Sequence, residues 1–201
     1  MEQTVFFESE GFKLEGLIGR ESNDRAVVLT HPHPLYGGEM HNPVVEIVAG
    51  AYRKIGYTSL RFNFRGVGAS RGSFDDGIGE QQDVLAALSY LSDMGFARID
   101  LAGYSFGAWV NAHADTGRAV YERMVMISPP VAFMDFRKIS ALPRLALVVA
   151  GDRDDIGPPD MIRQYLPGWN PAASFEIIPG ADHFYSGALD LLETVLTDAI
   201  T

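Results

Sequence analysis

A serine stands between two glycines in the stretch LAGYSFGAW, residues 101–109, where one apolar run ends and another begins. The pattern Gly-x-Ser-x-Gly between a strand and a helix is typical of a nucleophile elbow, a tight turn that lifts the serine oxygen above a sheet. Gly103 and Gly107 would let neighbouring backbone pack closely where a Cβ would clash. We therefore interpret Ser105 as a nucleophile, which needs a neutral imidazole to accept its proton and a carboxylate to hold that imidazole.

Acidic and imidazole side chains follow two later apolar runs of the chain. One run leads into GDRDD, which holds Asp152, Asp154 and Asp155, and the next leads into PGADHF, which holds His183. The order along the chain is therefore serine, acid, histidine. Ligands of open parallel sheets bind beyond the carboxyl ends of the strands, so we expect these groups to meet there. The residues alone leave open which of the three acids pairs with the histidine.

The hydropathy pattern predicts the elements that must position these groups. A hairpin is expected at 4–20. Further strands are predicted at 26–30, 57–64, 98–103, 123–129, 144–151 and 173–180, and helices at 43–56, 78–95, 106–117 and 185–200. This alternation predicts an α/β fold with a mostly parallel central sheet, helices on both faces, and a single domain over 1–201.

Composition narrows the functional classes. The 16 Lys and Arg against 26 Asp and Glu give a net charge of −10, which speaks against a nucleic-acid surface. Cysteine is absent, which excludes disulfides, thiolate metal sites and a cysteine nucleophile. No signal-peptide pattern opens the chain, and no apolar stretch is long enough for a membrane span. We therefore expect a cytoplasmic protein that binds neither nucleic acid nor membrane.

Two other motifs suggest different chemistry. His31 and His33 form an H-x-H pair that could bind a metal, but a metal site would leave the serine without a role. The glycines of 66–72 are spaced G-x-G-x-x-x-G, which is not the dinucleotide-binding pattern. We therefore expect no metal and no cofactor, and we expect Arg65 and Ser70 to be structural.

The segments THPHPLYGGEMHNPVV and FNFRGVGASRGSFDDGIGEQQDV accompany GYSFG, GDRDD and GADHF. With them the chain resembles the α/β-hydrolase superfamily over nearly its whole length, and more narrowly the small lidless bacterial hydrolases related to the dienelactone hydrolase family. The resemblance implies the α/β-hydrolase fold, Ser105 as nucleophile, His183 as general base and Asp154, in a Gly-x-x-Asp pattern, as the triad acid. Dienelactone hydrolases proper use a cysteine nucleophile, which this chain lacks.

The resemblance also implies an oxyanion hole, built from the N–H of Phe106 and one N–H of the loop after 26–30. The two prolines of HPHP have no N–H, which leaves His33, Leu35 and Tyr36 as donors. Leu35 is the donor if HPLYGG matches the family's segment, and His33 is the donor if HPHP does. We prefer Leu35.

The expected function is a serine hydrolase that cleaves small or short-chain carboxylic esters or thioesters through an acyl-enzyme. Only 129–143 separates two predicted strands where lids of this superfamily are commonly inserted, so we expect no cap domain and an open site. The alternatives are an acyltransferase or amidase with the same triad, and a non-catalytic binding protein on a hydrolase scaffold. The expected partner is a small ester, and a homodimer is left open.

Overall fold

The computed structural model describes residues 2–114, 120–139 and 141–200. Its strands are β1 (Glu2–Ser9), β2 (Phe12–Gly19), β3 (Arg25–Thr30), β4 (Thr58–Phe62), β5 (Arg98–Tyr104), β6 (Arg123–Ile127), β7 (Leu145–Gly151) and β8 (Ser174–Ile178). Its α-helices are α1 (Pro43–Lys54), α2 (Ile78–Asp93), α3 (Phe106–Ala114), α4 (Pro159–Trp169) and α5 (Leu189–Ile200), and a 3₁₀ turn covers Pro34–Tyr36. The strands form one sheet in the order β1-β2-β4-β3-β5-β6-β7-β8.

The sheet is antiparallel at one edge and parallel elsewhere. The β1–β2 hairpin turns at Glu10 and Gly11, both with positive φ, as a two-residue turn of type I′ requires. Strand β2 pairs antiparallel with β4, and every pairing from β4 to β8 is parallel. All residues of β4 are buried, as are those of β3 after Arg25, because helices cover both faces of a parallel sheet.

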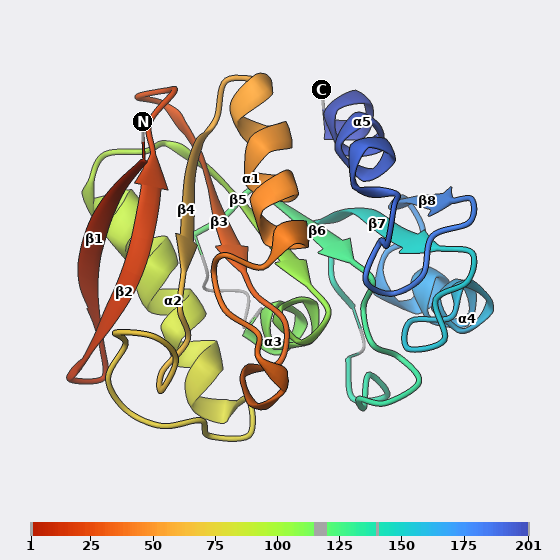
Figure 1. The fold of residues 1–201 in the computed structure, drawn as a ribbon, viewed down its shortest axis with the longest axis horizontal. Helices are drawn as coiled ribbons and strands as arrows, with labels where there is room; N and C mark the ends of the chain where they lie inside the picture. The colour runs from red at the N-terminus through yellow and green to blue at the C-terminus, as the bar shows by residue number, and fades with distance from the viewer. Residues whose placement is uncertain (1, 115–119, 140, 201) are drawn as a thin grey trace.

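Two apolar layers cover the sheet. One face carries α1 and α5, whose buried positions include Val48, Tyr52 and Leu192. The other face carries α2, α3 and α4 over a larger cluster that includes Phe62 and Trp169. Figure 1 shows α1 and α5 in front of the sheet and α2 behind it. The predicted mostly parallel sheet with helices on both faces is confirmed.

Some boundaries differ from the prediction. Helix α4 was not predicted, because the prolines at its start and Pro167 inside it suggest a loop. Strand β6 ends before Ser128, and the last helix begins at Leu189 and not at 185, because Ser128 and Tyr185 have positive φ. The predicted end of the third helix, 115–117, lies outside the described residues. Among the described helices, none has the length and apolar character needed to cross a membrane.

A buried ion pair ties the loop after β4 to α2. Arg65 is 5% exposed, and its guanidinium donates to both carboxylate oxygens of Asp83, which is fully buried. The same carboxylate accepts the Arg65 N–H at 3.0 Å. Ser70 in this loop donates to the Asn63 carbonyl at 2.7 Å. Arg65 and Ser70 therefore make the structural contacts expected of them.

Replacing Asp83 by Asn should lower the free energy of unfolding by about 3 kcal/mol, because it leaves the buried guanidinium with only the exposed carboxylate of Glu10 as a counter-charge. Urea unfolding followed by circular dichroism measures this. The matched control is Asp24→Asn, which breaks the exposed Arg98–Asp24 pair and should cost less than about 1 kcal/mol. Equal losses in the two variants would contradict a special role for the buried pair.

Candidate active site

Ser105 occupies the turn between β5 and α3 in a strained conformation. Its φ is 54°, a region that residues with a Cβ rarely adopt. The Ser105 N–H donates to the Ile127 carbonyl at 2.9 Å, and its carbonyl accepts the Ala108 N–H at 2.9 Å. These bonds hold the turn between a buried strand and the first turn of a helix, so the hydroxyl is fixed above the end of the sheet.

The two glycines of the turn are required by close contact with β3. A Cβ at Gly103 would lie 2.6 Å from the Thr30 Oγ1 and 2.7 Å from the Ala108 nitrogen. A Cβ at Gly107 would lie 2.5 Å from the Thr30 Oγ1 and 2.6 Å from its carbonyl oxygen. Real Cβ atoms do not approach other atoms so closely, which explains the glycines on both sides of Ser105.

The structure joins the three predicted residues by hydrogen bonds. The Ser105 Oγ lies 2.9 Å from the His183 Nε2, and the His183 Nδ1 lies 2.9 Å from both carboxylate oxygens of Asp154. All three residues are buried, with Asp154 2% exposed. Of the other acids of GDRDD, Asp152 accepts the Gly180 N–H at 2.7 Å, and Asp155 is exposed. The geometry thus selects Asp154 to face the imidazole.

The environment of Asp154 favours its charged form. Burial raises the pKa of this carboxyl, but the hydrogen bond and charge of His183 and the N–H of Gly157 outweigh the burial. The Ser128 hydroxyl contributes in the same direction, and the pKa is held below the usual range. The N–H groups of Ile156 and Gly157 donate to Oδ1 at 2.9 and 2.7 Å. An ionised carboxylate in this position fixes the tautomer of the imidazole.

Two buried tyrosines support this arrangement, and sequence reasoning missed both roles. The Tyr104 hydroxyl donates to the His183 carbonyl at 2.9 Å. The Tyr185 hydroxyl lies 2.9 Å from the Ser128 Oγ, and both residues have positive φ. Tyr104 precedes the serine and Tyr185 follows the histidine by two positions, and this closeness in sequence was the only available signal.

The loop after β3 supplies a backbone donor to the same place, but the donor differs from the preferred prediction. The Leu35 N–H donates to the Nδ1 of His33 at 3.2 Å, and the Tyr36 N–H donates to the His33 carbonyl at 3.0 Å. Leu35 also does not line the pocket around Ser105, whereas His33 does. The His33 N–H has no acceptor among the described residues. The geometry therefore favours His33 over Leu35.

The N–H of Phe106 is the other predicted donor. Phe106 begins α3, where the first N–H groups of a helix lack an intrahelical acceptor and lie at the positive end of the helix dipole. Its ring is 1% exposed and packs against Phe64, Phe74 and Trp109. The residue therefore combines an anchored side chain with a backbone donor beside the Ser105 hydroxyl.

His31 stabilises this loop from within the core. Its Nε2 accepts the Phe64 N–H at 3.0 Å, and its Nδ1 donates to the Pro32 carbonyl at 2.7 Å. Burial lowers the pKa of His31 to about 4, so the ring is neutral. Both ring nitrogens are occupied by backbone groups, so His31 has no lone pair to offer a metal ion beside His33.

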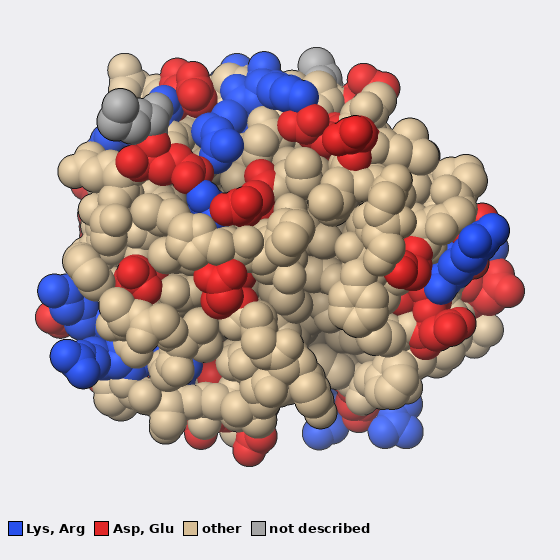
Figure 2. All heavy atoms as spheres, viewed as in Figure 1, with Lys and Arg blue, Asp and Glu red and all other residues tan. Residues whose placement is uncertain are grey.

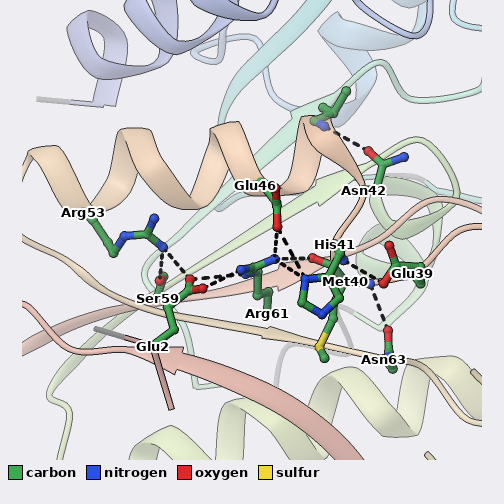
Figure 3. Close-up of polar contacts among 11 residues, drawn as sticks. Glu2, Glu39, Met40, His41, Asn42, Glu46, Arg53, Ser59, Arg61 and Asn63 are labelled. Atoms are coloured by element: carbon green, nitrogen blue, oxygen red, sulfur yellow. Dashed lines mark hydrogen bonds and ion pairs between the residues drawn. The ribbon is translucent and has the colours of Figure 1, made fainter. Parts of the chain in front are cut away.

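A buried arginine holds the far end of the same loop (Figure 3). Arg61 on β4 is 4% exposed and donates to Glu2 at 2.6 Å, to Glu46 at 2.9 Å and to the Met40 carbonyl at 2.8 Å. The Met40 N–H donates to the Asn63 side chain at 2.9 Å. Both backbone groups of Met40 are therefore fixed by the side chains of Arg61 and Asn63, at and just after the end of β4.

A pocket of about 680 Å³ opens above Ser105. Its walls come from three stretches of the chain, 32–42, 130–134 and 183–184, together with the nucleophile turn and Ile156. This volume is typical of sites for small organic molecules.

Known proteins show the same architecture. No family model matches the chain. An uncharacterised protein of Rickettsia prowazekii is 36% identical over 196 residues, which cover 90% of this chain and 81% of that protein. An α/β serine hydrolase homologue from Coxiella burnetii is similar with a TM-score of 0.89 and 31% identity, covering 99% of this chain and 97% of that one. An α/β serine hydrolase without a lid from Xanthomonas campestris has a TM-score of 0.89 and 31% identity, covering 99% and 93%.

The fold and these similarities define the class of the protein as an α/β-hydrolase. Within this class, the chain belongs to the family of small α/β serine hydrolases without a lid, as the sequence predicted. The narrower relation to dienelactone hydrolases stays a prediction.

The lowered pKa of Asp154 predicts how stability depends on pH. A carboxyl with a depressed folded-state pKa contributes stability above the unfolded pKa of about 4 and loses it as the pH falls through the folded value. Between pH 6 and 3, the native chain should therefore lose more stability than Asp154→Asn, by no more than about 1.4 kcal/mol, the most that one carboxyl with an unfolded pKa of about 4 can lose over this range. Denaturant unfolding at each pH measures this. Asp155→Asn is the control and should follow the native curve, and parallel curves for all three proteins would refute the assignment.

Proposed function

We propose that this hydrolase cleaves small or short-chain carboxylic esters, or thioesters, with Ser105 as nucleophile, His183 as general base and acid, and Asp154 as the acid of a catalytic triad. The observation that carries the proposal is the continuous chain of hydrogen bonds from the Ser105 Oγ through both nitrogens of His183 to Asp154. A serine hydroxyl is a weak nucleophile unless such a base accepts its proton.

In the first half of the reaction, the Ser105 Oγ attacks the carbonyl carbon while the His183 Nε2 takes the hydroxyl proton. The carbonyl oxygen becomes an oxyanion, which the N–H groups of Phe106 and His33 stabilise. The bond to the alcohol or thiol then breaks, and His183 returns the proton to that leaving group. Throughout, the Asp154 carboxylate stabilises the imidazolium.

In the second half, water gives a proton to His183 as its oxygen attacks the acyl carbon. The bond to the Ser105 Oγ breaks, His183 returns the proton to the serine, and the carboxylic acid leaves. Tyr36 is 87% exposed and Phe184 66% exposed at the mouth of the pocket, which supports direct access of water to the acyl-enzyme. This access favours hydrolysis over transfer to another acceptor.

The absence of a lid supports small substrates. Segment 129–143 joins β6 to β7 by turns in its described part, so no cap covers the pocket where long acyl chains could be enclosed. We expect higher kcat/KM for short acyl esters than for long ones.

A fluorophosphonate probe tests the nucleophile without a chosen substrate. We expect one adduct, located on Ser105 by peptide mapping, and its loss in Ser105→Ala and His183→Ala. Turnover of an activated short-chain ester should fall by about 10⁶-fold in either variant, as it does when a serine or histidine is removed from a comparable triad.

Ser186→Ala is the matched control, since this exposed serine lies three positions after His183, and it should keep full labelling. A folded protein with no adduct and no ester cleavage would overturn the proposal and favour a binding protein. Identification of the acyl product as free acid or as transferred group separates hydrolysis from acyl transfer.

A further inference from the structure

The pocket above Ser105 is built without charged side chains. None of the described residues that line it is an aspartate, glutamate, lysine or arginine, although these types make up 21% of the chain. The hollow in the lower middle of Figure 2 is correspondingly walled by tan surface. A charged group of a ligand bound there would meet no opposite charge. Burying a charge without a partner is strongly unfavourable.

Two polar side chains of the lining, those of Asn42 and His33, each accept a backbone N–H. Asn42 caps α1 by accepting the Val44 N–H at 3.0 Å. The His33 Nδ1 accepts the Leu35 N–H, and burial lowers the pKa of His33 despite a nearby carboxylate of Asp76. The imidazole of His33 therefore lines the pocket in its neutral form and does not supply a positive charge for an anionic ligand.

Two carboxylates that adjoin lining residues make anions still less suitable. Asp76 acts on His33 through its charge. Asp182 precedes His183 and is fixed beside the pocket by accepting the N–H groups of Phe184 and Ser186 at 3.0 and 2.9 Å. The net charge of −10 for the whole chain also disfavours long-range attraction of an anionic ligand to the protein.

Aromatic rings form the rim of the pocket. Tyr36, Phe133 and Phe184 come from three different loops and are 87%, 74% and 66% exposed. The Tyr36 ring packs on His33 and the Phe184 ring packs edge-on against His183, so two of the rings are anchored beside the reacting groups. Large apolar side chains gathered around a concave site and left in water are typical of a surface that a ligand covers.

We propose that the substrate is an ester with no charge on either side of the scissile bond, and that its apolar or aromatic part packs against Phe133 and Phe184. The inference rests on the proposed hydrolase function. It excludes acyl groups that end in a carboxylate, and thioesters whose carrier bears phosphates, because the pocket offers them no cation.

Three p-nitrophenyl esters of similar length and different charge test the acyl side: the pentanoate, the monoglutarate and the ester of γ-trimethylammoniobutyrate. The pentanoate should show a kcat/KM at least about 100-fold above the glutarate, the ratio expected when an ion is desolvated without a partner. It should also exceed the cationic ester. On the alcohol side, methyl para-acetoxybenzoate should be cleaved faster than para-acetoxybenzoate.

Two variants test the residues that impose this preference. Met134→Lys places a cation in the wall of the pocket and should raise the ratio of kcat/KM for the glutarate to that for the pentanoate by about 10-fold or more. Leu191→Lys makes the same change of charge on α5 and should leave this ratio unchanged.

Phe133→Ala should lower kcat/KM for the pentanoate by about 10-fold, because it removes the ring against which the substrate packs. Phe6→Ala, which removes an exposed phenylalanine of β1, should not change it.

The outcomes separate this inference from the function on which it rests. If Ser105 is labelled and esters are cleaved without regard to charge, the inference fails and the hydrolase function stands. Preference for the cationic ester would replace it with aromatic recognition of a cation. If Ser105 is not labelled and no ester is cleaved, the proposed function fails, and the inference fails with it.

Discussion

The site depends on the close approach of the nucleophile turn to the end of β3. Thr30 touches the positions where Gly103 and Gly107 have no Cβ, and its hydroxyl bonds to Asn111 of α3. This contact sets how close the first turn of α3 lies to the strand, and so where the Phe106 N–H lies. The same strand continues into the loop that carries His33. A positive φ at a non-glycine residue such as Ser105 costs on the order of 1–3 kcal/mol, which only a tightly packed surrounding can maintain.

The histidine and the acid are held by a second set of constraints on the other side of the serine. Tyr104, next to the nucleophile, bonds to the backbone of His183, so the two reacting side chains share one rigid connection. Ser128 and Tyr185 join the end of β6 to the histidine loop. The loop that carries the histidine is therefore fixed to the ends of β5 and β6 by buried hydroxyls. Such support gives the Ser105–His183 hydrogen bond its 2.9 Å geometry without help from a lid.

Much of this could be predicted from the sequence because the signals are local. The apolar runs, the Gly-x-Ser-x-Gly turn and the strand-end acids and histidine each depend on a few neighbouring residues. Helix α4 was missed because a run of prolines also suggests a loop. The structure shows that these prolines lie at the start of the helix and near its end, and the sequence pattern alone does not distinguish that arrangement from a loop. Leu35 was preferred on the match of HPLYGG to the family's segment. Its N–H is bonded to the His33 ring, and this bond depends on the fold of the loop, which the motif does not reveal. The bond from Arg61 to Glu2 joins residues 59 positions apart, and no local pattern predicts it.

The uncharged lining and the missing lid are physically related. Electrostatic stabilisation of an oxyanion by N–H groups is stronger when water is excluded, and many hydrolases achieve this by closing a cap. Here the rings of Phe133 and Phe184 are exposed to solvent, so water must be excluded by the substrate that packs against them. An apolar substrate packed against them displaces water from the Ser105 hydroxyl as it binds, whereas a charged one would bring its hydration shell into the pocket. In a pocket lined by uncharged side chains and not covered by a lid, the bound substrate itself must exclude water from the reacting groups. The best substrates are therefore those whose apolar part covers the site.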